Sequence, residues 1–171
     1  TYDVGGHEGR KSAVPLLTRT ISYIYEGTKS PIINESKMEY RNLYGAITRY
    51  IYTGDPTSTH DDYITDITYY SGSELDGFGV RSKNILVIPK VISVKINGSE
   101  KRRRVSGDID AFGMAKKIIT TQGSNGLAET LMEYDKYGNL IKLTLPENST
   151  GQKMVYTYIY DTVLNKYLSS V

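Results

Sequence analysis

A short turn motif recurs along this chain of 171 residues. Its clearest copy is Tyr134–Leu140, with the sequence YDKYGNL, in which an aspartate follows an aromatic residue and precedes a glycine by three positions. Ile109–Gly113 repeats the order of large apolar residue, Asp, any residue, aromatic residue and Gly. Arg41–Gly45 has Asn in the Asp position, and Tyr160–Leu164 has leucine in the glycine position. A recurring turn of this kind predicts an array of similar units rather than one enzyme pocket.

Each position of the motif has a physical reason. An aspartate at the start of a turn accepts hydrogen bonds from backbone N–H groups two residues on, and glycine supplies the positive φ that ends the turn without a Cβ clash. The aromatic residues before Asp and before Gly are expected to pack on neighbouring hairpins. The residues predicted to build these turns are Tyr134, Asp135, Tyr137, Gly138, Asn139, Asp110, Phe112, Gly113, Asn42, Tyr44, Gly45, Tyr160 and Asp161.

Between the turns the chain favours strands, because β-branched and aromatic residues recur with a period of two. The predicted strands cover residues 21–25, 47–52, 63–70, 91–96, 99–105, 118–121, 140–145 and 154–160. Asn97-Gly98 predicts a type I′ hairpin turn, since both residues accept a positive φ, and a second turn is expected at Pro146–Gly151. Residues 127–134 fit a strand or a short helix, because Leu127, Leu131 and Tyr134 also match a helical spacing. We predict an all-β fold, a meander of β-hairpins in an open, twisted sheet.

The amino-acid composition and the net charge exclude several classes of protein. Hydrophobic residues make up 39% and charged residues 23% of the chain, which is typical of a folded protein. There is no cysteine, which excludes disulfides and thiolate metal sites. The net charge of +2 is too small to indicate a nucleic-acid partner. No apolar run approaches the roughly 20 residues that a membrane-spanning helix requires.

The tyrosines suggest a division of the chain. There are 16 tyrosines, and none lies between Tyr70 and Tyr134. We therefore predict a degenerate repeat region at residues 1–75, an insertion that carries the Asn97-Gly98 hairpin at residues 76–104, and hairpins of the clearer repeat at residues 105–171.

The segment Tyr134–Leu140, followed by Tyr160-Asp161, resembles the tyrosine-aspartate (YD) repeat of RHS-repeat proteins. The wider layout resembles RHS-type segments of bacterial toxin-complex and virulence-plasmid-like proteins. The features that carry this wider resemblance are Leu16–Arg19, the Asp61-Asp62 strand that ends in Tyr69-Tyr70, and Arg102–Arg104 leading into Asp110–Gly113.

The resemblance implies a structural role without catalytic residues or a cofactor. Hairpins of that family form a hollow β-shell around a variable C-terminal toxin or effector domain. This chain would then be a wall segment of a larger shell, in a secreted or cell-surface bacterial protein. Its partners would be the rest of its own full-length chain and the enclosed effector domain. Open strand edges are also expected to pair edge to edge with another copy, or to be capped by loops.

Other candidate sites have simpler structural explanations. His60-Asp61-Asp62 has the chemistry of a metal site, but a second cluster with ligand spacing is missing and a solvated loop is favoured. Asp110 and Asp135 could serve as acid–base groups or calcium ligands, although turn acceptors explain them better. Lys101–Arg104 is favoured as a charged hairpin edge rather than a phosphate site.

The tyrosine-rich faces support an alternative function. Exposed rings could bind glycans or partner proteins, for example through Tyr50, Tyr52, Tyr69 and Tyr70 or through Tyr156, Tyr158 and Tyr160. Burial of these rings between hairpins is the favoured interpretation. A hydrolase would need two convergent carboxylates in a pocket, and the sequence does not predict an enzyme.

Overall fold

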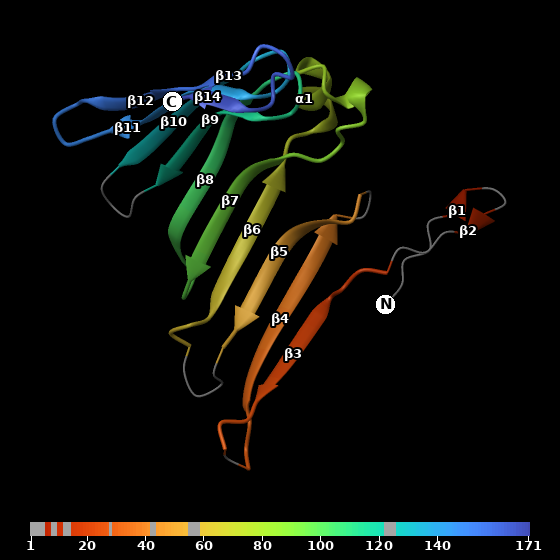
Figure 1. Ribbon diagram of the computed structural model, residues 1–171. Helices are drawn as coiled ribbons and strands as arrows, with labels where there is room; N and C mark the ends of the chain where they lie inside the picture. The colour runs from red at the N-terminus through yellow and green to blue at the C-terminus, as the bar shows by residue number, and fades with distance from the viewer. Residues whose placement is uncertain are drawn as a thin grey trace. The chain divides into compact units, whose positions relative to one another are not determined.

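The computed structural model describes residues 6–7, 10–11, 15–27, 29–41, 44–54, 59–121 and 126–171. Its main feature is one ten-stranded antiparallel sheet in which the strands follow one another in chain order (Figure 1). These strands are β3 (Arg19–Ile24), β4 (Ile32–Arg41), β5 (Ala46–Thr53), β6 (Tyr63–Tyr69), β7 (Pro89–Ile96), β8 (Ser99–Ile109), β9 (Ala115–Thr121), β10 (Leu127–Tyr134), β11 (Leu140–Glu147) and β12 (Lys153–Thr157). The predicted all-β meander of hairpins is therefore confirmed.

The remaining elements are short. β1 (Gly6–His7) pairs with β2 (Arg10–Lys11), and β13 (Ile159–Tyr160) pairs with β14 (Leu168–Ser170). A helix, α1 (Gly72–Gly77), and a 3-10 turn, η1 (Arg81–Lys83), lie between β6 and β7. In the described part of the chain, no helix is long and apolar enough to cross a membrane.

The chain forms two compact units. The first comprises Thr1–Thr65 with Ile96–Gly98, and the second comprises Asp66–Lys95 with Ser99–Val171. The best copies of the turn motif all belong to the second unit. The division into segments 1–75, 76–104 and 105–171 stays a prediction.

The ambiguous segment 127–134 is a strand. β10 pairs with β9 through Leu127–Leu131 and with β11 through Leu131–Tyr134, so each part of the strand has a backbone partner on at least one side. The apolar residues at helical spacing do not form one buried face, because the first of them, Leu127, is 72% exposed. Pairing with two neighbouring strands thus outweighs a local pattern that an eight-residue helix would have to sustain alone.

One strand was not predicted, and several strand boundaries differ from the predicted ranges. β4 was not predicted, because its central residues Asn34–Lys37 are polar and lack an apolar alternation. β11 continues through Pro146 to Glu147, so the next turn begins at Asn148. The register between β11 and β12 shifts after Thr144, and such an irregularity accommodates a proline that cannot donate a hydrogen bond.

The core of the second unit is small and lies beneath α1 and η1. Its buried residues are Tyr70, Leu75, Val80 and Ile109. Three half-buried residues pack against them, namely Phe78, Ile85 and Ile88. The helical insertion therefore supplies a covered apolar face at the end of β6 and β8, where an open sheet would expose these side chains.

Candidate functional site

The turn after β8 is built on one aspartate side chain. Oδ1 of Asp110 accepts hydrogen bonds from the backbone N–H groups of Phe112 at 2.8 Å and Met114 at 2.9 Å. The backbone of Asp110 donates to the carbonyl of Met114 at 2.8 Å and accepts from the N–H of Gly113 at 3.0 Å. Gly113 has a φ of +81°, which a residue with a Cβ rarely adopts. One carboxylate oxygen and two backbone hydrogen bonds therefore close the five-residue turn together.

The turn after β10 repeats this arrangement bond for bond. Oδ1 of Asp135 accepts from the N–H groups of Tyr137 at 2.8 Å and Asn139 at 2.9 Å, and Gly138 donates to the Asp135 carbonyl at 3.1 Å. The Asp135 N–H donates to the Asn139 carbonyl at 3.0 Å, and φ of Gly138 is +87°. Burial raises the pKa of the Asp135 carboxyl, but hydrogen bonds from the Asn139 side chain and from the turn backbone outweigh it and lower this pKa.

A further copy begins at Asn148, between β11 and β12. Its Oδ1 accepts from the N–H groups of Thr150 at 3.0 Å and Gln152 at 2.9 Å, and Gly151 donates to its carbonyl at 3.0 Å. This copy was not predicted, because the aromatic residues of the motif are absent from it. An Asn or Asp followed three positions later by Gly is the signal that would have found it.

The turn at Asp161 is wider than the others. Its carboxylate accepts hydrogen bonds from five successive backbone N–H groups, those of Val163, Leu164, Asn165, Lys166 and Tyr167. Asn165, with a φ of +53°, takes the left-handed conformation that glycine takes in the shorter turns. The backbone hydrogen bonds, that from Tyr167 first, lower the pKa of the Asp161 carboxyl well below its usual range.

The two remaining predicted turns lie outside this group. In the segment 42–45, Gly45 has a φ of +63° and donates to the carbonyl of Arg41 at 3.2 Å, and Tyr44 is 40% exposed. Asn42 lies outside the described residues. Asn97 and Gly98 connect β7 to β8 with φ values of +50° and +75°, as a type I′ turn requires.

Tyrosine hydroxyls connect successive units of the repeat. Tyr134 donates its hydroxyl to the carbonyl of Ala115, and Tyr160 donates to the carbonyl of Leu140, each at 3.1 Å. Ala115 and Leu140 are the first residues of β9 and β11, directly after the turns of Asp110 and Asp135. Tyr134 therefore binds the strand that begins after the Asp110 turn, and Tyr160 binds the strand that begins after the Asp135 turn.

The aromatic residues before the glycines are more exposed than packing between neighbouring hairpins would leave them. Phe112 is 45% and Tyr137 is 57% exposed. Lys83 lies over the ring of Phe112 at 4.8 Å from its centroid, and Lys136 lies over that of Tyr137 at 4.9 Å. The middle of a tight turn lies outside the paired strands, so a side chain there has no cross-strand neighbour to cover it.

Neighbouring turns touch one another at the same end of the second unit. A Cβ on Gly113 would lie 3.1 Å from Ile88, and a Cβ on Gly138 would lie 3.1 Å from Met114 of the preceding turn. Nδ2 of Asn139 donates to the carbonyl of Asn165 in the following turn at 2.7 Å. The helical insertion and the turns of Asp110, Asp135 and Asp161 thus form a continuous row, which we call the turn row.

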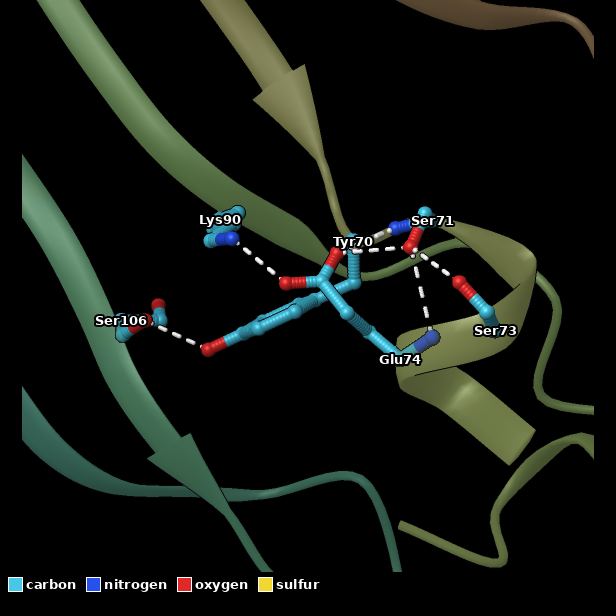
Figure 2. Close-up of polar contacts among 6 residues, drawn as sticks. All are labelled: Tyr70, Ser71, Ser73, Glu74, Lys90 and Ser106. Carbon is cyan, nitrogen blue, oxygen red and sulfur yellow. Dashed lines mark hydrogen bonds and ion pairs between the residues drawn. The ribbon is translucent and has the colours of Figure 1, made fainter. Parts of the chain in front are cut away.

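The turn row begins with the helical insertion, which is held to the neighbouring strands by polar contacts around Tyr70 (Figure 2). The hydroxyl of Tyr70, which is 3% exposed, donates to the carbonyl of Ser106 on β8 at 2.5 Å. Ser71 and Glu74 form a capping box that begins α1, and Lys90 donates to Glu74 Oε1 at 2.5 Å. Helix α1 was not predicted, although Ser followed three residues later by Glu is the sequence signal of such a box.

Substitution of Glu74 with glutamine is expected to reduce the loss of stability in acid. The hydrogen bond from Lys90, followed by those from Ser71, lowers the pKa of Glu74 from 4.5 to about 2. A carboxyl with a lowered folded-state pKa contributes stability that is fully present above its unfolded value and is lost as the pH falls through its folded value. Urea unfolding between pH 4.5 and 2 should therefore show a shallower pH dependence for Glu74→Gln. Lys90→Met removes the same pair and should also flatten the curve, whereas parallel curves for all three proteins would contradict the pairing.

Two substitutions of Asp110 are expected to show whether its hydrogen bonds or its negative charge stabilise the turn. Asp110→Ala removes two hydrogen bonds to backbone N–H groups and should lower the free energy of unfolding by about 1–2 kcal/mol. Asp110→Asn should stay close to the parent chain, because Asn148 makes the same two kinds of bond with an amide oxygen. Chemical denaturation measures both. Equal losses in the two variants would show that the charge itself is required.

The chemistry of the turn row is that of backbone support. The carboxylates of Asp110, Asp135 and Asp161 each accept two or more backbone N–H groups of the turn that they begin, so the turn itself accounts for the aspartate at each position. Within the described ranges no group of three His, Cys, Asp or Glu residues is arranged to hold a metal ion.

No protein-family model, no curated protein and no solved structure matches this chain.

Proposed function

We propose that this chain is a non-enzymatic structural segment of an RHS/YD-repeat protein from a secreted or cell-surface bacterial system. In this proposal its hairpins form part of a β-shell wall that sequesters a C-terminal effector or toxin domain. The mechanism is geometric, because repeated hairpins extend one sheet while each turn supports the next.

The observation that carries the proposal is the identity of the turns of Asp110 and Asp135. The two aspartates are 25 residues apart in the sequence and make the same four hydrogen bonds within their turns. Tyr134 and Tyr160 add equivalent bonds between successive units. Because the same hydrogen bonds recur within and between successive units, the residues of the YD-like motif have an architectural role in this proposal.

The tyrosines favour this role over glycan or protein binding. Tyr63 stacks on Tyr52 with ring centroids 5.2 Å apart, and its centroid lies 5.9 Å from that of Tyr50, so Tyr63 contacts both of the other half-buried rings. The rings at the C-terminal edge, Tyr156, Tyr158 and Tyr160, are half-buried as well. Ring faces that cover each other present less area to a sugar. Binding of the chain to a glycan array would support the alternative function.

Limited proteolysis of the full-length protein tests the proposal. An effector domain enclosed by the shell should be cleaved much more slowly within the full-length protein than as an isolated domain. Gly113→Val, which disturbs the turn row, should accelerate that cleavage, whereas Gly98→Val, at a turn with open space around it, should accelerate it less. Equal cleavage of the enclosed and isolated domains, or a full-length protein without further repeats, would overturn the proposal.

A further inference from the structure

The last strand of the main sheet has an unpaired outer edge. β12 pairs with β11, and no other described strand of that sheet lies beside it. The N–H of Tyr158 donates to the carbonyl of Ile141 on β11 at 2.9 Å. Because antiparallel pairing alternates along a strand, Val155 and Thr157 direct their N–H and C=O groups away from β11. These groups are the ones that a further strand would meet.

β14 already occupies the beginning of that position. It pairs with β13, which continues β12, and it places Ser170 opposite Ile159 and Leu168 opposite Tyr160. In antiparallel register, the second and fourth positions after Ser170 would face Thr157 and Val155. A strand that continued the path of β14 would therefore cover the outer edge of β12.

The start of β14 also matches the strands that follow the shorter aspartate turns. Leu168 follows the turn of Asp161 as Leu140 follows that of Asp135 and Ala115 follows that of Asp110. Three positions later stand Val171, Leu143 and Ile118, which are all apolar. The start of β14 therefore has the same sequence pattern as the starts of β9 and β11.

The side chains along this edge are apolar and exposed. Their exposed fractions range from 50% to 69%. They are Met154, Val155, Ile159, Leu168 and Val171. Unpaired backbone groups beside exposed apolar side chains are the features by which a sheet accepts an added strand.

The tyrosine bonds indicate what kind of strand would fit this edge. The carbonyls of Ala115 and Leu140 each accept a hydroxyl from the tyrosine of the next hairpin. The carbonyl of Leu168 is the next in this series, and no tyrosine of the described residues donates to it. A hairpin of the same repeat would bring such a tyrosine.

We propose that the outer edge of β12 binds one further β-hairpin of this aspartate-turn repeat. The first strand of that hairpin lies beside Val155 and Thr157, in line with β14, and its tyrosine donates a hydroxyl to the carbonyl of Leu168. This inference rests on the repeat architecture of the proposed function, but it does not depend on any enclosed effector domain.

An extended chain tests the inference. Because Val171 occupies the position of Leu143, a second copy of residues 144–165 joined directly after Val171 continues the repeat in phase. Hydrogen exchange at the amides of Val155 and Thr157 should slow by about tenfold or more in the extended chain, since pairing protects them from local opening. An extension of the same residues in scrambled order should leave their exchange unchanged. An extension whose copy of Tyr160 is phenylalanine should give part of the protection.

The other outcomes overturn the inference. Unchanged exchange at both amides in the extended chain would show that the hairpin does not dock there. Equal protection by the scrambled extension would show that the repeat is not recognised. Concentration-dependent protection in the parent chain, together with a dimer in analytical ultracentrifugation, would assign the edge to a second copy of this chain. Failure here leaves the proteolysis test of the full-length protein intact, so the two proposals are distinguishable.

Discussion

Replacement of Leu75 with alanine is expected to lower the free energy of unfolding by about 2–5 kcal/mol, because it removes a large side chain from a closed site. Leu75 is 1% exposed and lies in the cluster with Tyr70, Val80 and Ile109 beneath the helical insertion. Few side chains are buried among the described residues, so the remaining core has little capacity to compensate. Urea denaturation monitored by circular dichroism gives the change directly.

Two further variants make this expectation specific. Leu127→Ala makes the same chemical change at a side chain that is 72% exposed, and it should alter stability by no more than about 0.5 kcal/mol. Leu75→Met keeps the volume of the buried side chain and should cost less than about 1.5 kcal/mol. A small loss for Leu75→Ala, similar to that of Leu127→Ala, would mean that the insertion does not hold a packed core in solution.

Replacement of Gly113 with alanine is expected to cost about 2 kcal/mol or more. The left-handed conformation of Gly113, with a φ of +81°, costs about 1–2 kcal/mol for a residue with a Cβ. The added Cβ would also lie 3.1 Å from Cδ1 of Ile88 and 3.3 Å from Cγ2 of Ile85. Both isoleucines are branched and pack against the core cluster, so they cannot move aside without loss of contacts. Thermal and chemical unfolding measure the sum of the two effects.

Gly98→Ala separates these effects. Gly98 has a similar φ of +75°, but nothing lies within 4 Å of the Cβ position. Its substitution should therefore show only the conformational cost, and the difference between the variants measures the contact of the turn with the helical insertion. Equal losses at the two glycines would contradict a packed turn row.

The sequence was most informative where the interactions are local. The bonds of the Asp135 turn lie within five residues, so the identity of an aspartate and a glycine at fixed spacing was enough to expect the turn. The Asn148 turn and the capping box of Ser71 and Glu74 are equally local. They were not predicted, because the Asn148 turn lacks the aromatic residues of the motif and the six-residue helix is too short to show an apolar periodicity.

Longer-range features were predicted less well. The segment 127–134 carried patterns for both strand and helix, and its pairing with β9 and β11 decided between them. β4 lacked an apolar alternation, yet it is ten residues long because strands on both sides pair with it. The exposure of Tyr137 also differed from expectation, since the position of a ring relative to neighbouring hairpins does not follow from the motif alone.

By itself the sequence determined that the chain is built from β-hairpins with aspartate turns, because turn chemistry acts between residues a few positions apart. Only the tertiary structure decided that Tyr134 and Tyr160 reach the carbonyls of Ala115 and Leu140, and that the turns and the helical insertion form one row. These contacts join residues about 20 positions apart, and they exist only after the strands have paired in register.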